Sequence, residues 1–201
     1  VVEALHKKIP LPISIDTSKS EVMRAAVNAG AGMINDVRAL RETGALETAA
    51  QLGVPVCLMH MRGEPRTMQD DPRYADIVGE VRDFLKQRLD ACTNAGIPAS
   101  RLVVDPGFGF GKTLEHNIEL LRGLKKLQNL GTPVLVGLSR KSMIGKALGL
   151  PVEQRLHASV ALAVMAVQQG ARIVRVHDVG PTVEALRMWA AVYPETTNRF
   201  I

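Results

Sequence analysis

The sequence predicts an α/β fold: a (β/α)8 TIM barrel, of which this chain supplies about the last six βα units. Six short apolar runs alternate with helical patterns along the 201 residues, which is the order of parallel strands joined by right-handed crossovers. Each run ends in polar or charged side chains, and in a barrel these carboxyl ends converge on one rim. A doubly wound sheet places ligands mainly near one crevice, so polar groups at all six strand ends favour the barrel.

The expected strands are the apolar runs at residues 12–16, 32–35, 54–60, 102–105, 134–138 and 172–177. Helical patterns lie between and after them, at residues 20–29, 44–52, 76–95, 115–127, a stretch from 141 through 169, and 181–192. Another helical pattern covers residues 1–8. Glycine follows most of these patterns, as is common at helix ends. No linker-like stretch divides the chain, which predicts a single domain over residues 1–201.

An eight-stranded barrel typically needs about 250 residues, more than the 201 present here. The chain opens in a helical pattern that leads directly into the first expected strand. We therefore expect two βα units on the amino-terminal side to be missing from this sequence.

Composition restricts the class of function. Hydrophobic residues make up 46% of the chain, enough for a sizeable core, and Lys plus Arg outnumber Asp plus Glu by 25 to 20. The basic residues are spread along helices, without the clustered stripe or interleaved aromatics of a nucleic-acid surface, and fit a pocket for an anionic small molecule. No run approaches the roughly 20 apolar residues of a membrane span. Cys57 and Cys92 are isolated, which suggests a reducing compartment, so we expect a cytoplasmic protein without nucleic-acid or membrane partners.

The segment from Val103 to Lys112 is the most informative. An apolar run ends at Asp105, and three glycines alternate with two phenylalanines before the lysine. Glycine permits positive φ and close approach of the backbone to a ligand. Phe108 and Phe110 could offer flat apolar faces to an aromatic ligand, with the charge of Lys112 nearby. Asp-Pro-Gly is also ordinary turn chemistry that needs no ligand.

The other strand ends carry candidate ligand groups of the same kind. They are Asp16, Asn35 with Asp36, His60, the run from Ser139 to Lys141, and Arg175 with His177 and Asp178. Arg175 and His177 alternate on the last expected strand, so both should face the same side and could hold an anion, although a solvated edge is the alternative. The glycine and lysine spacings match neither a dinucleotide fingerprint nor a P-loop, and no zinc-type spacing of histidines and cysteines is present.

Six short motifs occur in order, and together they resemble dihydropteroate synthase, the folate-pathway enzyme that sulfonamides target. They are Ile-Asp-Thr-Ser-Lys at 15–19, Ile-Asn-Asp at 34–36, Cys-Leu-Met-His-Met at 57–61, Asp-Pro-Gly-Phe-Gly-Phe-Gly-Lys at 105–112, Ser-Arg-Lys-Ser at 139–142 and Arg-Val-His-Asp at 175–178. The resemblance covers nearly the whole chain. It lacks the family's amino-terminal third, whose loops carry an asparagine that helps bind diphosphate and magnesium.

The resemblance implies that 6-hydroxymethyl-7,8-dihydropterin diphosphate is joined to para-aminobenzoate, giving 7,8-dihydropteroate and diphosphate. The implied catalytic residues are Asp16, Asp105 and Lys141. The pterin would contact Asp16, Asn35, Met59, Asp105 and Lys141. The diphosphate would contact Arg175 and His177. Para-aminobenzoate would contact Gly109, Phe110, Arg140, Lys141 and Ser142. Mg²⁺ would arrive with the diphosphate, without a protein metal ligand in this chain. A homodimer is also implied, with Met188 and Trp189 as candidate interface residues.

Several alternatives stay open at this point. Asp16 and Asp105 could be strand-end caps that need no ligand, and Met59 could be an ordinary core residue. For His60, a hydrogen-bonded strand end is the better interpretation than a catalytic base. For the whole chain, the alternatives are a methyltetrahydrofolate-dependent methyltransferase-like pterin barrel, which has no use for a diphosphate site, and an inactive or partner-dependent pterin-binding fragment.

Overall fold

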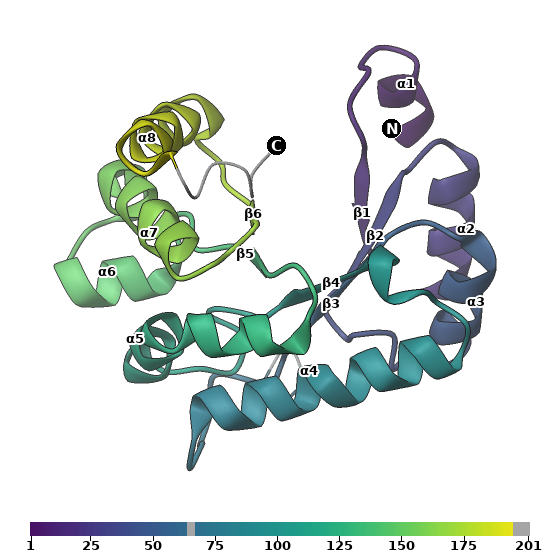
Figure 1. Cartoon of the computed structure of the whole chain (residues 1–201), viewed down its shortest axis with the longest axis horizontal. Coiled ribbons are helices and arrows are strands. Elements are labelled where there is room, and N and C mark those ends of the chain that lie inside the picture. The colour runs from purple at the N-terminus through teal and green to yellow at the C-terminus, as the bar shows by residue number, and fades with distance from the viewer. Residues whose placement is uncertain (64–66, 195–201) are drawn as a thin grey trace.

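Parallel strands surrounded by helices make up the computed structural model, which describes residues 1–63 and 67–194 (Figure 1). The strands are β1 (Ser14–Asp16), β2 (Met33–Asp36), β3 (Val56–Met59), β4 (Leu102–Asp105), β5 (Leu135–Val136) and β6 (Ile173–Val174). The α-helices are α1 (Val2–His6), α2 (Ser20–Asn28), α3 (Ala45–Leu52), α4 (Ile77–Asn94), α5 (Leu114–Arg122), α6 (Ser142–Leu148), α7 (Leu156–Gln168) and α8 (Val179–Val192). Short 3-10 helices are η1 (Ala99–Arg101), η2 (Leu124–Leu130) and η3 (Val152–Gln154). In this described part, no helix is long and apolar enough to cross a membrane.

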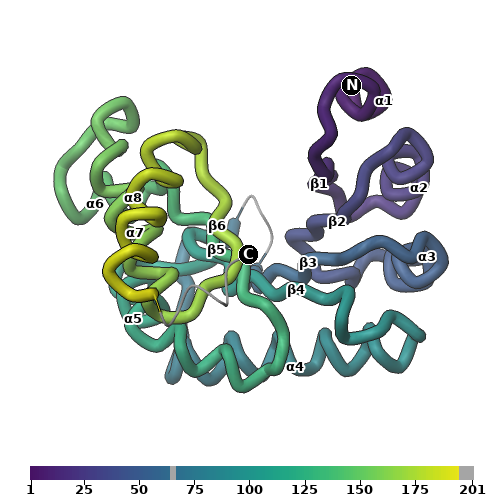
Figure 2. Tube along the Cα trace, turned by 45° about the horizontal axis from the view of Figure 1, so that its top comes forward, coloured from purple at the N-terminus to yellow at the C-terminus, as the bar shows by residue number. Residues whose placement is uncertain are grey.

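The strands are neighbours in the order of the chain. β1, β2, β3 and β4 form one parallel sheet, and β5 pairs in parallel with β6. A parallel bridge between Val104 and Val134 joins the two sheets, with the Val104 amide donating to the Pro133 carbonyl at 3.0 Å. A doubly wound sheet would reverse its strand order at a switch point, so this order confirms the barrel type. β1 and β6 end the series and lie apart from each other in both views (Figures 1 and 2), as expected for a partial barrel.

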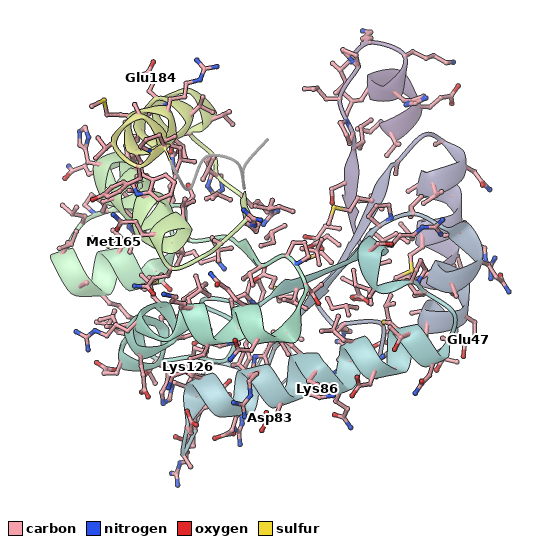
Figure 3. All side chains as sticks on the ribbon, in the orientation of Figure 1. Glu47, Asp83, Lys86, Lys126, Met165 and Glu184 are labelled. Atoms are coloured by element: carbon pink, nitrogen blue, oxygen red, sulfur yellow. The ribbon has the colours of Figure 1, made fainter. Side chains whose placement is uncertain are left out.

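The two faces of the sheet bury different side chains, because successive residues of a strand point to opposite sides. Leu58 and Val104 belong to the main core beneath the helices, together with Leu85 of α4. Charged residues of α4 such as Asp83 and Lys86 lie on its outer side (Figure 3). Cys57 and Val103 pack with Leu135 in a second, smaller cluster on the inner face.

This alternation selects the polar strand-end residues that face inward. Asp16 and Asn35 are partners in the β1–β2 register, and Asn35 is the partner of Cys57 in the next pair. Met59 is the partner of Asp105 between β3 and β4. Since Cys57 faces inward, these four residues share the inner face, and they lie at the carboxyl ends of their strands. The packing that fixes the strands therefore also fixes the rim of the site.

Several element boundaries differ from those expected. The strand 102–105 is as predicted, whereas the last strand stops at Val174, so Arg175 and His177 lie beyond it. The stretch 141–169 is not one helix, because Gly149 adopts the left-handed conformation (φ 70°) and Pro151 follows, which separates α6 from α7. The pattern at 115–127 is also divided: α5 ends at Arg122 and a 3-10 helix continues the chain.

Candidate active site

Asp16, Asn35 and Arg175 meet at the rim where the two ends of the strand series face each other. Asn35 donates from Nδ2 to Asp16 Oδ2 at 3.1 Å, and Arg175 Nη2 lies 3.9 Å from the same oxygen. Both charged side chains are largely solvent-exposed, at 49% for Asp16 and 70% for Arg175. The backbone amide of Arg175 donates to the Val136 carbonyl at 2.8 Å, which holds its main chain against β5. A carboxylate and a guanidinium group therefore lie side by side at the rim, and both keep solvent-exposed surface.

Asp105 is the buried carboxylate of the site, with 8% of its surface exposed. Its Oδ1 accepts a hydrogen bond from the Gly107 amide at 2.7 Å. Burial raises the pKa of Asp105, because the charged form loses hydration. The Gly107 amide and the cations Lys141, Lys112 and Arg175 act in the opposite direction. Asp105 is therefore a desolvated acceptor surrounded by positive charge.

Lys141 lies over the turn that follows Asp105. Its Nζ donates to the Phe108 carbonyl and is 4.6 Å from the centre of the Phe110 ring. Burial lowers the pKa of Lys141 to about 8; Asp105 raises it and Arg175 lowers it. A Cβ at Gly109 would be 3.3 Å from Lys141 Cδ, so the lysine stem runs directly over this glycine. Lys141, Gly109 and Phe110, all predicted to share a ligand, are brought together.

The glycines of this turn are required by close backbone contacts. Gly107 and Gly111 have φ of 69° and 63°, a region that side chains disfavour. A Cβ at Gly107 would lie 1.9 Å from the His60 carbonyl oxygen, and one at Gly111 2.3 Å from that of Arg62. The turn consequently packs tightly on the segment after β3.

One expectation for this turn is wrong, and its lysine is buried although its charge lies near Asp105. Phe108 is fully buried in the main core and offers no face to a ligand. Lys112 is 2% exposed, and its ammonium points into the protein toward His60 and two backbone carbonyls. The alternation of glycine and phenylalanine does not reveal which ring faces the core. Phe110 is the ring that stays at the rim, beneath Lys141.

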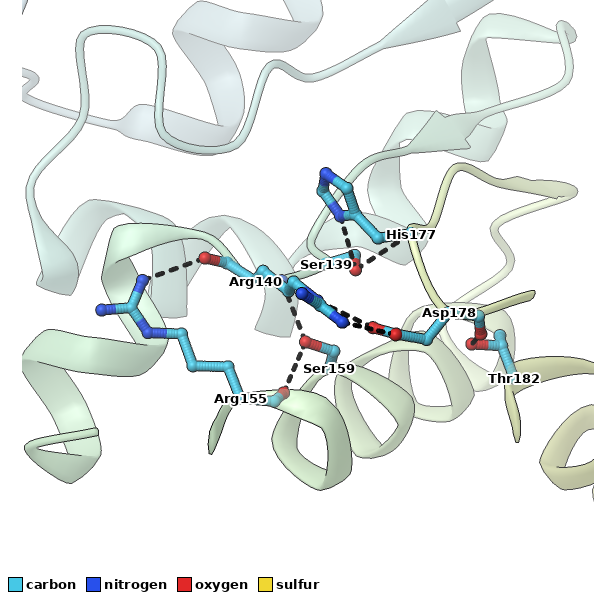
Figure 4. Close-up of polar contacts among 7 residues, drawn as sticks. All are labelled: Ser139, Arg140, Arg155, Ser159, His177, Asp178 and Thr182. Atoms are coloured by element: carbon cyan, nitrogen blue, oxygen red, sulfur yellow. Dashed lines mark hydrogen bonds and ion pairs between the residues drawn. The ribbon is translucent and has the colours of Figure 1, made fainter. Parts of the chain in front are cut away.

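Arg140 belongs to a polar network that joins the turn after β5 to the turn after β6 (Figure 4). Its Nε and Nη2 donate to the two carboxylate oxygens of Asp178 at 2.9 and 2.6 Å. Its amide donates to Ser159 Oγ at 2.9 Å, and its carbonyl accepts from Arg155 Nη1 at 3.0 Å. These bonds stabilise an unusual positive φ of 56° at Arg140. The side chain predicted to bind para-aminobenzoate is thus paired with Asp178, a role that the strand-end pattern did not indicate.

The alternation predicted that His177 and Arg175 share one face of the last strand. This is wrong, because β6 ends before both residues. The amide and the Nδ1 of His177 both lie within hydrogen-bond distance of Ser139 Oγ, at 3.2 and 3.0 Å (Figure 4). Arg175 reaches instead toward Asp16. Ser142 is exposed at the first position of α6, beside Lys141.

The carboxyl end of β3 completes the inner wall. Met59 is 3% exposed and lies beside Asp105 in the register. Burial lowers the pKa of His60 to about 3, and the neighbouring Lys112 adds to the effect. The imidazole is therefore neutral and hydrogen-bonded, as expected for a structural strand-end histidine. Within residues 1–63 and 67–194, no group of three or more His, Cys, Asp or Glu side chains could hold a metal ion.

The fold and the site define a class of protein: a parallel barrel whose rim presents carboxylates, an amide and cations around one site. Residues 1–177 match the family described as pterin binding enzyme. The chain is 52% identical over 191 residues to the dihydropteroate synthase of Haemophilus influenzae, covering 95% of this chain and 70% of that protein. It is 50% identical to the Escherichia coli enzyme of the same name, covering 99% of this chain and 71% of that protein.

Solved structures give the same result. A Yersinia pestis dihydropteroate synthase in a sulfonamide complex superposes with a TM-score of 0.95 at 49% identity, covering 97% of this chain and 71% of that one. The Xanthomonas albilineans enzyme in complex with 7,8-dihydropteroate gives a TM-score of 0.91 at 53% identity, covering 96% and 71%. The chain belongs to the dihydropteroate synthase family.

Proposed function

We propose that this protein condenses 6-hydroxymethyl-7,8-dihydropterin diphosphate with para-aminobenzoate, releasing diphosphate and forming 7,8-dihydropteroate. The observation that carries the proposal is the single rim on which Asp16, Asn35, Asp105, Lys141 and Arg175 converge. Family membership supports it, since close relatives bear the name of this reaction.

The pterin would occupy the inner face between β1 and β4. A pterin ring presents N–H donors and acceptors in one plane, for which carboxylates and a bifunctional amide are suitable partners. Asp105 would accept from the amino group and a ring N–H, and Asn35 and Asp16 would contact the opposite part of the ring. Met59 lies beside Asp105 in the register and would supply the apolar floor. Buried acceptors of this kind discriminate strongly against ligands that lack the matching donors.

The diphosphate would lie near Arg175 and His177, beyond the end of β6. Arg175 keeps most of its surface exposed and contacts Asp16 only at 3.9 Å, so its guanidinium is available to an anion. His177 offers a ring nitrogen that does not face Ser139. We propose that Mg²⁺ arrives bound to the diphosphate, as the family resemblance implies; such an ion would neutralise charge on the leaving group.

Para-aminobenzoate would lie beside Lys141, on Gly109 and the Phe110 ring. The ring of Phe110 gives an apolar surface for the arene, and Lys141 supplies positive charge. Its carboxylate would be directed toward Ser142. Arg140 can contact the para-aminobenzoate carboxylate only if its guanidinium binds that group and Asp178 at the same time, or breaks its ion pair with Asp178.

The chemistry requires little from a base. The bond between the pterin methylene carbon and the diphosphate oxygen breaks, and its electron pair leaves with the diphosphate. The amine lone pair of para-aminobenzoate forms the new C–N bond, after which the nitrogen loses one proton to solvent. Positive charge that develops on the methylene and the ring is stabilised by the nearby carboxylates Asp16 and Asp105, an electrostatic effect of a few kcal/mol at most.

We also propose a cytoplasmic homodimer. Support for the location is limited to two free cysteines, Cys57 and Cys92, which is usual in a reducing compartment. Support for the dimer is the apolar exposure along α8, where Val179 is 61% and Met188 65% exposed.

The test is to incubate the natural full-length protein with both substrates and to identify the products by mass spectrometry. Formation of 7,8-dihydropteroate with one equivalent of diphosphate supports the proposal. Binding of the pterin diphosphate without formation of the C–N bond, under conditions where a known synthase turns over, would contradict it.

A further inference from the structure

Five successive backbone carbonyls of the turn after β4 accept hydrogen bonds from side chains. Tyr74 Oη donates to Gly111, Gln69 to Gly109, and Lys141 to Phe108. The remaining two carbonyls, those of Gly107 and Phe110, both accept from the ammonium of Lys112, at 2.9 and 3.0 Å. Lys112 thus closes the turn from inside the protein while Lys141 covers it from the rim.

The surroundings of Lys112 match its charge and its number of donors. An ammonium has three N–H donors, and the third is directed at His60 Nδ1 at 2.9 Å. His60 is itself held by an edge-to-face contact with Phe84, with ring centres 4.9 Å apart. A buried cation is costly unless it is paired and hydrogen-bonded. Burial lowers the pKa of Lys112 to about 7 and Lys141 adds to the effect, whereas the nearby Asp105 carboxylate raises it and the three acceptors stabilise the ammonium.

We propose that Lys112 is a positioning residue for the arylamine substrate: by holding the Gly107 and Phe110 carbonyls, it sets the position of the Phe110 ring against Lys141. This inference rests on the proposed function, in which the arylamine contacts Phe110. The pterin partners Asp16 and Asn35 lie at strand ends held by the β1–β2 register. Neither depends on this turn, and the main chain of Asp105, whose carboxylate accepts from the Gly107 amide, is held by the β3–β4 register. Loss of Lys112 should therefore affect the arylamine more strongly than the pterin.

The first test replaces Lys112 by methionine, which has a similar length but neither charge nor donors, in the natural full-length protein. The matched control is Lys126→Met, at an exposed lysine of η2 on the outer surface (Figure 3). In Lys112→Met we expect the KM for para-aminobenzoate to rise at least tenfold, and the KM for the pterin diphosphate to change less than threefold. Equal changes in both constants, or no change beyond threefold in either, would overturn the proposal. If the methionine variant does not fold, Lys112→Leu, which also lacks charge and donors, is judged by the same criterion.

A second test measures how rigidly the turn is held and does not require enzymatic activity. Amide hydrogen exchange of the peptide 105–112 in the ligand-free protein should be at least tenfold faster in Lys112→Met than in the wild type or in Lys126→Met. Unchanged exchange would refute the positioning role even if the wild type is an active synthase. Absence of product from the wild type would refute the proposed function, while faster exchange would still establish that Lys112 fixes the turn.

Discussion

Replacing Asp105 by asparagine should separate ligand binding from stability. The carboxylate is buried and accepts from the Gly107 amide at 2.7 Å, a bond that the asparagine oxygen can keep. What is lost is the charge that would pair with pterin N–H donors. A hydrogen bond to a charged group contributes about 1.5–3 kcal/mol, so pterin affinity should fall roughly 10- to 150-fold, since 1.36 kcal/mol is a factor of ten.

The same substitution should change the stability of the fold little at neutral pH. Because the pKa of Asp105 in the folded protein is raised above its ordinary value, its stabilising contribution is complete only at low pH and decreases as the carboxyl ionises. Asparagine removes that ionisation. It also removes the charge that raises the pKa of the buried Lys112 and Lys141. Because the two effects oppose each other, we expect a thermal midpoint close to that of the wild type in Asp105→Asn, and a Lys141 pKa below about 8.

The assay combines calorimetric titration with a dihydropterin ligand and thermal unfolding at pH 7. The control is Asp90→Asn, which removes a carboxylate paired with Lys86 on the exposed face of α4. Pterin affinity of Asp105→Asn within threefold of the wild type would refute the role of Asp105. A large fall in its thermal midpoint, without one in the control, would refute the argument from burial.

Three further predictions concern charged groups around the same site. Lys141→Met should reduce turnover about 100-fold or more, the usual effect of losing one electrostatic donor. Wild-type turnover should decline as the pH rises through about 8, where Lys141 loses its proton. A flat pH profile of turnover from pH 7 to 9 would contradict this role. Arg175→Ala should lower the affinity for the pterin diphosphate about tenfold and leave the affinity for free hydroxymethylpterin nearly unchanged. Equal losses of affinity for both ligands in calorimetry would exclude an anion site there. Arg187→Ala on α8 is the control. His60, with its pKa lowered to about 3, should make stability fall as the pH drops below about 6.5, by up to about 1.4 kcal/mol per unit. His60→Gln should flatten this slope in denaturant titrations, and an unchanged slope would assign it to other groups.

The strands and the site rim could be predicted because both depend on local sequence. The run from Leu102 is apolar as far as Val104, and Asp105 and Pro106 follow. A proline cannot donate to the next ladder bond, so the local sequence determines where the strand ends. The inward position of Asp16, Asn35 and Asp105 follows from the period of two along each strand. These features need no knowledge of distant contacts.

The errors lie where tertiary contacts decide the structure. His177 was assigned to a strand by alternation, but Ser139, 38 residues earlier, accepts from its amide and turns it away. Lys112 was expected near the ligand, yet the acceptor at His60, 52 residues away, makes burial possible. The pairing of Arg140 with Asp178, again 38 residues distant, was likewise not predicted. No local pattern specifies such pairings.

The most direct measurement is the rate of diphosphate release from the dihydropterin diphosphate by the natural full-length protein, with and without para-aminobenzoate. We expect release that depends on para-aminobenzoate, saturates with it, and is lost in Asp105→Asn. Release at the same rate without the arylamine, or an arylamine-dependent rate that Asp105→Asn leaves unchanged, would contradict the account.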